Sequence, residues 1–407
     1  MKLHTIFIFL LLLSMLFSCS RECVNAPVKP NVVEKGDTAR KTLLVYMMAE
    51  NSLDDFAAVD IAEIEAAAKS IPRDCRLFVY TDDRSFPVIY QYFSLTNGEP
   101  GSSVFHIFPT DVCSSDTASL GAVLDFILGN YPTKSLDLVL WSHGDGWLPA
   151  PLNVAPQRSI GIDNGNNSYS NNVTESIEME ELTTLLKRLP VNVDRLLFDA
   201  CFMQCAEGAY ALKDAVEWII ASPAEIPGDG APYETVVPAF FLTEGPEDIM
   251  SAYIEGYSGE PAGAVLSAVH TAGMDSLAYV SFYYINKYFG INSKRDYVDV
   301  FSYLPGGKYT GTKRYPCYYD MNAIMAKYLT AEEFAHWRAA LDGAVKYVAS
   351  SPKWYSAVCG RVIEYNTVVG CGLSLYMPRK SSYNEYFNTC FKYTEWYSAA
   401  GWQSAGW

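Results

Sequence analysis

The chain has 407 residues, of which 50% are hydrophobic and 14% aromatic, so it can bury a substantial core in one large domain or two. Its formal net charge of −16 argues against nucleic acid and anionic membrane surfaces as partners, because both carry negative charge themselves. With only five histidines, no CxxC pair and no HExxH motif, the chain is also a poor candidate for a transition-metal enzyme.

The N-terminus is typical of an export signal rather than of a fold. A lysine precedes the apolar stretch Ile6–Leu13, which is far too short to span a bilayer. Residues 16–19 (LFSC) then resemble a bacterial lipobox, in which Cys19 becomes the lipid-modified first residue. Plain signal-peptidase cleavage nearby is the alternative, although the phenylalanine before the serine is bulky for it. We expect a signal peptide over 1–18, a flexible tether over 19–40 and a lipoprotein of the bacterial cell envelope that touches the membrane only through its lipid.

Beyond residue 40, compact apolar runs alternate with segments of helical periodicity. In chain order we expect strand 41–48, helix 53–69, strands 76–80, 88–93 and 104–108, helix 117–131, strand 136–141, helix 178–189, strand 195–198, helix 203–213 and strand 218–221. The polar segment 148–173 is expected to be an exposed loop. Strands that alternate with helices and are apolar throughout predict an α/β/α sandwich with a mainly parallel central sheet, over residues 41–230.

The C-terminal third continues the mixed pattern. We expect strand 263–269, helices 276–288, 323–328 and 331–349, and strand 372–376. Because no low-complexity linker precedes this part, residues 231–407 are predicted to pack on the core as an α/β extension.

Two predicted strands end in the side chains that a thiol nucleophile and its base require. Strand 136–141 is followed by Ser142-His143-Gly144, and strand 195–198 by Asp199-Ala200-Cys201. A thiol attacks only as a thiolate, so it needs an imidazole close by. The carboxyl ends of adjacent parallel strands lie at one edge of a sheet, so His143 and Cys201 are expected to meet there despite 58 residues of separation. An Ala-Cys nucleophile with its histidine about 50 residues upstream is also the caspase pattern.

Each residue alone has a structural interpretation: Cys201 as a buried thiol or disulfide half, His143 as a structural histidine. A predicted helix start after Cys201 favours the thiolate. Gly144 lets the backbone approach a substrate carbonyl, so the N–H groups of Gly144 and Cys201 are expected to form an oxyanion hole. A serine hydrolase is disfavoured because there is no G-x-S-x-G elbow.

Asp199 keeps two interpretations. Positions i and i+2 of a strand point the same way, so its carboxylate can line the pocket beside Cys201 and select Arg or Lys in a substrate. Alternatively, Asp199 is the N-cap of the following helix.

The chain contains ten cysteines, and exported proteins often contain disulfides. With Cys19 lipid-modified and Cys201 catalytic, eight remain, and the sequence does not determine their pairing. No cofactor is predicted to be required. Calcium is possible at four aspartates, although residues of this kind more often form solvated loop ends: Asp54, Asp55, Asp82 and Asp83.

With these residues in view, the chain resembles the clostripain family of bacterial cysteine peptidases, which have a caspase-like fold. The resemblance covers residues 41–400 and rests on an ordered set of motifs: LLVYMMAENSL at 43–53, LWSHGDGW at 140–147, LLFDACFMQ at 196–204, ASPAEIPGDGAPY at 221–233 and GLSLYMP at 372–378. It implies an exported cysteine endopeptidase with His143 as base, Cys201 as nucleophile and Asp199 as the selector of Arg or Lys before the scissile bond.

Family members often mature by self-cleavage between the histidine and cysteine strands. Here this implies cleavage after Arg158, in the loop 148–173; the other basic residues of that region lie in or against predicted elements: Lys187, Arg188 and Arg195.

Two residues depart from the family pattern: Asp145 stands where glycine is common, and Ala231 where an aromatic is common. These departures put specificity in doubt more than catalysis. They leave open a catalytically inactive, lipid-anchored peptide-binding protein of the same fold. Cleavage after acidic residues is a weaker third option, because Asp199 would repel such substrates.

Overall fold

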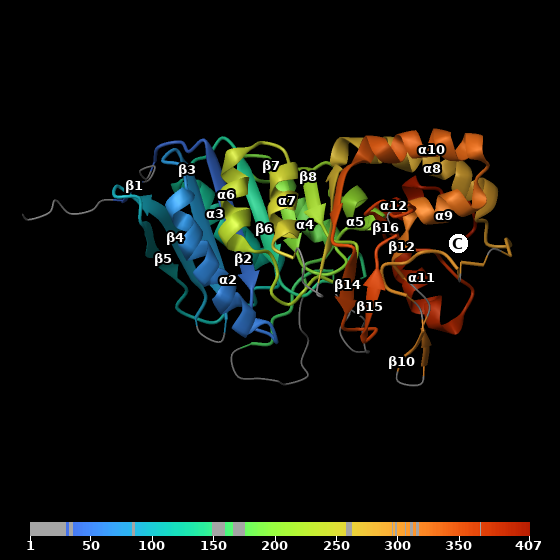
Figure 1. Ribbon diagram of the computed structural model, residues 1–407, viewed down its shortest axis with the longest axis horizontal. Coiled ribbons are helices and arrows are strands. Elements are labelled where there is room, and N and C mark those ends of the chain that lie inside the picture. Colours follow the sequence, from blue (N-terminus) through green and yellow to red (C-terminus); the bar gives the residue numbers. More distant parts are fainter. Residues whose placement is uncertain are drawn as a thin grey trace, which may run out of the picture.

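The computed structural model describes residues 30–31, 36–83, 86–148, 159–165, 176–257, 263–294, 296–297, 299–305, 307–309, 312–314, 317–366 and 368–407. Its centre is a ten-stranded sheet in the order β1-β4-β3-β2-β6-β7-β8-β9-β13, with β5 paired to β4 (Figure 1). The strands are β1 (Pro30–Asn31), β2 (Lys41–Met48), β3 (Cys75–Asp82), β4 (Val88–Leu95), β5 (Pro100–Ile107), β6 (Leu136–Trp141), β7 (Val193–Asp199), β8 (Val216–Ala221), β9 (Val265–His270) and β13 (Val345–Ser350).

The five central strands, β3, β2, β6, β7 and β8, run parallel, and antiparallel strands flank them on both sides. Every residue of β2 and β6 is buried, because helices cover both faces of the sheet. The α/β fold with a mainly parallel sheet centre is therefore confirmed.

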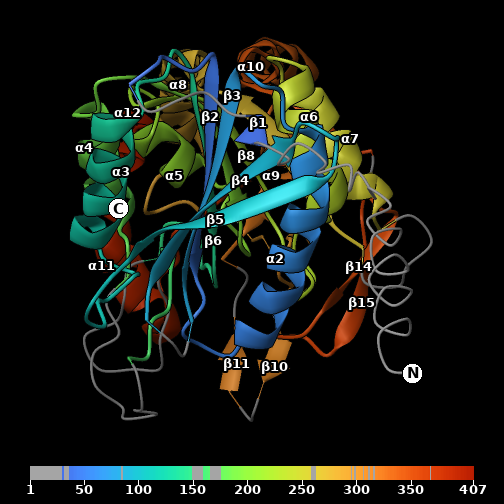
Figure 2. The same ribbon diagram turned by 90° about the vertical axis from the view of Figure 1, so that its left-hand side faces the viewer.

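Two layers of helices enclose the sheet, as the view along it shows (Figure 2). One layer contains α2 (Asp54–Ala67), α6 (Tyr233–Leu242) and α7 (Glu247–Glu255); the other contains α3 (Thr117–Asn130), α4 (Met179–Lys187) and α5 (Ala206–Ala211). Alternate residues of each strand enter different cores: Val45 packs in the core with α2 and α6, and Tyr46 in the core with α3 and α4.

The path of the chain creates a switch point beside β2. From β2 the chain passes through α2 to β3 on one side, and after β4 and β5 it returns through α3 to β6 on the other side. In open α/β sheets, ligands bind outside the carboxyl ends of the strands at such a point. Here those ends lead into the segments after Met48 and Trp141.

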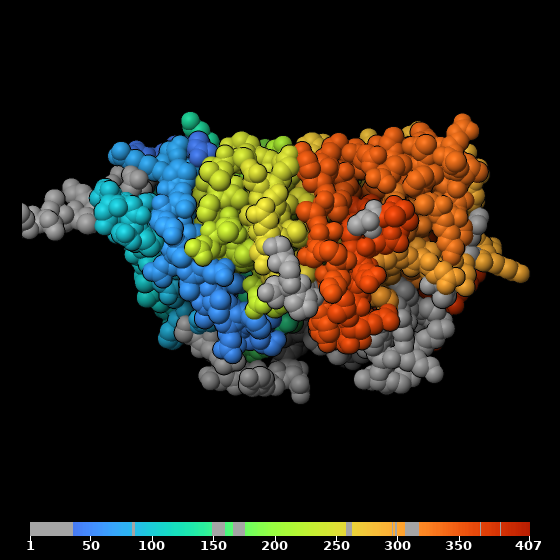
Figure 3. All heavy atoms as spheres, viewed as in Figure 1, coloured from blue at the N-terminus to red at the C-terminus, as the bar shows by residue number. Residues whose placement is uncertain are grey.

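The C-terminal part packs against one end of this sandwich, where it forms the orange and red region of Figure 3. It contains α8 (Met274–Tyr288), α9 (Met321–Tyr328), α10 (Ala331–Ala344), α11 (Glu385–Phe391), α12 (Glu395–Ala399), and the short strands β10 (Gly307–Tyr309), β11 (Thr312–Arg314), β12 (Tyr319–Asp320), β14 (Lys353–Ser356), β15 (Arg361–Glu364) and β16 (Ser374–Leu375). β9 and β13 continue the central sheet beyond the boundary predicted at residue 230.

Two predicted helices have the wrong extent. The helix expected over 331–349 ends at Ala344, and residues 345–350 form β13, which pairs antiparallel with β9. The helix expected over 203–213 is only Ala206–Ala211. Within the range expected to be a tether, Pro30–Asn31 pairs with β4, and Ala39 is fully buried and bridges to Thr133.

The cysteines of the described residues, eight in number, are all free thiols. Cys19 and the rest of the predicted signal peptide lie outside the described residues. Among the helices that are described, none has the length and apolarity needed to cross a membrane.

Candidate active site

The sheet brings the His143 and Cys201 segments together, as the strand argument predicted. β6 and β7 pair in parallel with Trp141 opposite Asp199, so the residues two positions further on, His143 and Cys201, leave the sheet side by side. Gly144 lies directly against this turn: a Cβ added to Gly144 would stand 2.8 Å from the Cys201 carbonyl oxygen. A side chain at position 144 would therefore displace the backbone of Cys201.

The turn after Cys201 is strained. Phe202 has φ of 61°, and it is the only non-glycine residue with positive φ in the part of the chain that the structure describes. Such a conformation costs on the order of 1–3 kcal/mol and persists where the surroundings determine it, often at functional sites. Here the Phe202 N–H donates to the Ala224 carbonyl at 2.9 Å, and its ring stacks on Tyr318 with centroids 4.3 Å apart.

The Cys201 thiol is not poised as a thiolate. Its Sγ accepts the Ile226 N–H at 3.4 Å and lies 4.0 Å from the Ile226 carbonyl oxygen. Burial raises the pKa of Cys201 to about 12; the Ile226 N–H lowers it, and the charges of Glu225, Asp145 and Asp199 raise it further. The expected help from a helix dipole was wrong, because α5 begins only at Ala206. The thiol in this conformation is protonated at neutral pH.

His143 is held by residues that the sequence did not single out. Its Nε2 lies 2.9 Å from the hydroxyl of Ser52, which follows β2, and its carbonyl oxygen accepts the Gly161 N–H at 3.0 Å. The neighbouring Ser142 hydroxyl donates to the Met48 carbonyl at 3.0 Å. His143 is therefore positioned by the end of β2 and by residues 159–165.

Two backbone N–H groups are available beside the thiol. Gly144 lies opposite Ile160 in an antiparallel bridge. The hydrogen bonds of this bridge are made by the neighbouring residues: the Asp145 N–H donates to the Ser159 carbonyl, and the Gly161 N–H donates to the His143 carbonyl. Within the described ranges, neither the Gly144 N–H nor the Cys201 N–H donates to another residue. Unused N–H donors are one requirement of an oxyanion hole.

Asp199 is buried and bonded by three donors. Its Oδ2 accepts the Ala231 N–H and the Tyr233 hydroxyl, both at 2.9 Å, and its Oδ1 accepts the Tyr253 hydroxyl at 3.0 Å. Burial raises the pKa of Asp199, and these three donors lower it. The N-cap interpretation was wrong, because the N-cap of α5 is Cys205. The carboxylate holds the loop that leads into α6. Ala231, which departs from the family pattern, contributes its backbone N–H to this contact.

Further acidic residues surround this loop, and sequence reasoning missed them. Asp60 of α2 is 1% exposed and accepts the Trp141 indole N–H at 2.7 Å. Burial raises the pKa of Asp60 to about 9, with further increases from Asp199, Glu63 and Asp229. Asp229 lies at the surface of the same loop. The available signal was the i, i+3 spacing of Asp60 and Glu63 on one helix and the acidic residue within PGDG.

Residues of the C-terminal part contact the segments that follow His143 and Cys201. The Tyr318 hydroxyl donates to the carbonyl of Asp145 at 2.9 Å, on the chain just after His143. Glu225, which precedes the residue that holds the thiol, accepts the Val358 N–H at 3.0 Å. The segments around His143 and Cys201 therefore depend on residues more than a hundred positions away in the sequence.

The proposed self-cleavage residue, Arg158, lies outside the described residues. Ser159, directly after it, is 1% exposed and donates to Glu178 at 2.9 Å. The rival residues are in elements as predicted: Lys187 ends α4 and Arg188 caps it, while Arg195 in β7 is fully buried.

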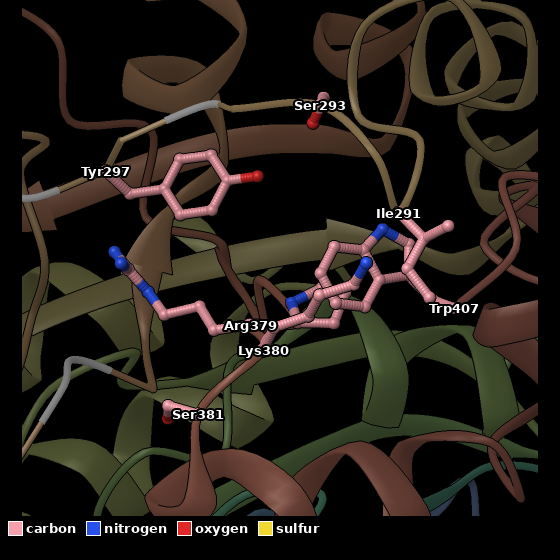
Figure 4. Close-up of a pocket in the computed structure, with 8 residues that line it drawn as sticks. Ile291, Ser293, Tyr297, Arg379, Lys380, Ser381 and Trp407 are labelled. Carbon is pink, nitrogen blue, oxygen red and sulfur yellow. The ribbon is translucent and has the colours of Figure 1, made fainter.

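A separate cavity of about 220 Å³ lies in the C-terminal part (Figure 4). Arg379, Lys380, Tyr297 and Trp407 are among its lining residues, and the Arg379 guanidinium lies 4.7 Å from the centre of the Tyr297 ring. None of the residues that line it belongs to the His143 and Cys201 segments, so it is not part of this site.

Comparison with known proteins places this geometry in a family. A profile of the Clostripain family matches residues 45–407, while no curated protein sequence matches the chain. A secreted C11 cysteine protease from Bacteroides thetaiotaomicron, solved with an irreversible peptide inhibitor, is 27% identical with a TM-score of 0.75 and covers 90% of this chain and 100% of its own. An inactive zymogen C11 protease from Parabacteroides distasonis is 26% identical with a TM-score of 0.73, covering 91% of this chain and 99% of its own.

Proposed function

This chain belongs to the clostripain family and is a cysteine peptidase, and we propose that Cys201 and His143 cut peptide bonds after Arg or Lys. The observation that supports the catalytic pair is the register of β6 and β7, which brings both segments to one sheet edge beside two unused N–H groups. The observation that supports basic substrates is the group of acidic residues around the loop before α6.

The reaction follows from these groups. The Cys201 thiol gives its proton to His143, and Sγ attacks the carbonyl carbon of the scissile bond. The N–H groups of Gly144 and Cys201 stabilise the oxyanion of the tetrahedral intermediate. His143 then protonates the leaving amine, and a thioester remains. Water, deprotonated by His143, hydrolyses the thioester and restores the thiol.

The preference for Arg or Lys is electrostatic. Asp199, Glu63 and Asp229 each raise the pKa of Asp60. No salt bridge joins any of these four residues to a basic side chain of the described chain. A substrate guanidinium or ammonium group would supply the positive charge that this group lacks. Asp229 is exposed and can pair with it directly, whereas Asp199 is buried and contributes through its field and by holding the loop.

Hydrolysis of fluorogenic peptides that end in Arg, Lys, Asp or Leu tests this function. We expect cleavage after Arg and Lys that is abolished by Cys201→Ala and retained in the matched control Cys359→Ala, a half-buried thiol of the C-terminal part. Asp229→Asn should reduce cleavage after Arg and Lys, whereas Asp125→Asn, on α3, should not. Undiminished turnover by Cys201→Ala would exclude Cys201 as the nucleophile.

The intact chain is a latent form in this proposal, and cleavage after Arg158 activates it. The protonated thiol of Cys201, whose pKa is raised by burial, supports latency. Intact mass of the active enzyme should show two fragments separated after residue 158, and Arg158→Ala should stay uncut and weakly active. A fully active enzyme that consists of one uncut chain would contradict this step.

A catalytically inactive binding protein is the second candidate, favoured by the protonated thiol. An arginine-bearing, thiol-directed affinity label separates the two functions: an enzyme becomes labelled at Cys201 after the loop is cut, whereas a binding protein stays unlabelled. Export as a lipoprotein is tested separately, since incorporation of labelled palmitate should be lost in Cys19→Ala.

A further inference from the structure

The cavity in the C-terminal part is built by three segments that are distant in the sequence (Figure 4). One segment follows α8, one follows β16, and the third follows α12. The first contributes Ile291 and Tyr297, the second Arg379 and Lys380, and the third Trp407. Drug-sized ligands occupy cavities of about 300–1,000 Å³, so a cavity of about 220 Å³ suits a smaller molecule.

Hydrogen bonds fix the walls of the cavity. The Asn388 side chain, on α11, accepts the Arg379 N–H at 3.4 Å and donates to the Arg379 carbonyl at 2.8 Å. The Trp407 indole N–H donates at 2.7 Å to the carbonyl of Phe289, two residues before Ile291. The cavity is therefore preformed, and a ligand that enters it does not have to order these walls.

The cavity is positively charged, although the chain as a whole carries a net charge of −16. Arg379 and Lys380 both line it, and no aspartate or glutamate is among its described lining residues, not even Asp296 beside Tyr297. Lys380 is exposed and makes no salt bridge within the described part of the chain. A cavity lined by one sign of charge concentrates ions of the opposite sign, so its ligand is expected to be an anion.

Two tyrosines hold the Arg379 guanidinium in place. Its central carbon lies 4.7 Å from the centre of the Tyr297 ring and 5.7 Å from that of the Tyr319 ring, and its Nη2 donates to the Tyr319 hydroxyl at 2.6 Å. Tyr297 is 3% exposed and Tyr319 is fully buried. Contact with aromatic rings orients the fork of guanidinium N–H donors, whose geometry matches carboxylate and phosphate groups.

Much of the remaining wall is apolar. Ile291, Pro378 and Trp407 contribute hydrocarbon or aromatic surface, and two serines complete the lining. Figure 4 shows Tyr297 above the Arg379 guanidinium at one end of the cavity, with Ile291 and Trp407 at the other. Apolar surface combined with a few convergent polar groups is typical of sites for small molecules.

We propose that this cavity binds a small organic anion. Arg379 and Lys380 bind its anionic group, which is a carboxylate or a phosphate ester, and a compact apolar body of about one ring packs against Trp407. The cavity shares no lining residue with the His143 and Cys201 segments. The site therefore does not depend on the proposed peptidase function, and either can fail without the other.

Fluorine NMR titrations of the full chain carrying Cys201→Ala test the site without any turnover. The probes are 4-fluorobenzoate, 4-fluorophenyl phosphate and the neutral 4-fluorobenzamide, which has the shape of the benzoate without its charge. At least one of the two anions should bind saturably, and the amide should bind at least tenfold more weakly. Saturation by neither anion, or equal binding of the amide, would overturn the proposal. The tighter of the two anions identifies the anionic group.

Exposed lysines supply matched variants that leave the core untouched. Lys380→Gln should weaken binding of the anions about three- to fivefold, which is the range expected for an exposed charge pair, and Lys380→Arg should retain it. Lys392→Gln, at the exposed C-cap of α11 and outside the cavity, should leave the affinity unchanged. Equal affinity in Lys380→Gln and its parent would overturn the assignment to this cavity. Inorganic phosphate that competes as tightly as the aryl anions would overturn the role of the apolar wall.

Discussion

The pKa of the Cys201 thiol leads to a quantitative prediction about latency. In the uncut chain burial holds this pKa at about 12. At pH 7.5 such a thiol is about one part in 30,000 thiolate, whereas an ordinary thiol with a pKa of about 8.5 is about one-tenth thiolate. The difference in thiolate population is therefore about 3,000-fold. A more basic thiolate is also more nucleophilic, with a Brønsted slope of about 0.4–0.5. This raises the rate constant of the thiolate about 40-fold and offsets part of its lower population.

The net expectation is that Cys201 of the uncut chain reacts with a small aromatic disulfide about 100-fold more slowly than an unperturbed cysteine. The measurement uses Arg158→Ala, which keeps the chain intact, with the rate at Cys201 followed by peptide mass mapping. The same chain in urea supplies the unperturbed rate as its own control. After the loop is cut, the rate at Cys201 should exceed that of the unfolded chain. Equal rates at Cys201 in the folded and unfolded intact chain would refute the view that burial keeps the thiol unreactive.

Three further predictions concern single side chains. Gly144→Ala should lower kcat by about 100-fold or more, since a Cβ would meet the Cys201 carbonyl oxygen at 2.8 Å and disturb the oxyanion hole; an unchanged kcat would exclude Gly144 from it. Asp137→Ala should lower the free energy of unfolding by about 3–5 kcal/mol in urea titrations, because the buried Arg195 guanidinium would lose the carboxylate that it binds at 2.5 Å and keep only backbone carbonyls as partners. Glu207 is buried, and its pKa is raised to about 7 from an ordinary value of 4.5, so the unfolded chain ionises first and wild-type stability should fall by about 3 kcal/mol as pH rises from 4.5 to 7. Glu207→Gln should lose this component of the pH dependence in chemical denaturation, and a parallel slope in both proteins would contradict it.

The central strands were predictable because strands that are buried on both faces appear in the sequence as continuous apolar runs. β2 was predicted with its observed bounds, since all eight of its residues are buried and no polar residue interrupts the run after Thr42. The end of helix α10 was not predictable in the same way. Residues 345–350 become a strand only because they pair with β9, about eighty residues earlier, and that pairing is absent from local periodicity.

The meeting of the His143 and Cys201 segments could be predicted because their two strands are adjacent and parallel. The residues that tune these segments could not, because each comes from a distant segment: Ser52 for His143, Ile226 for Cys201, and Tyr318 for the strained Phe202. Asp199 shows the difference most clearly. Its place beside the site followed from strand alternation, but its burial depends on hydroxyls of Tyr233 and Tyr253, which belong to helices that the sequence did not reveal.

These distant contacts also determine how the site can change state. The strain at Phe202 is held by Tyr318, and the thiol is held by Ile226, whose neighbour Glu225 is bound by residues of the C-terminal part. The base is held from the opposite side, by the end of β2 and by residues 159–165. Cutting the chain before Ser159 would free one end of the segment that holds the base while leaving the support of the thiol turn intact. Activation is therefore expected to reposition His143 and the loop around it against a nucleophile whose backbone stays in place.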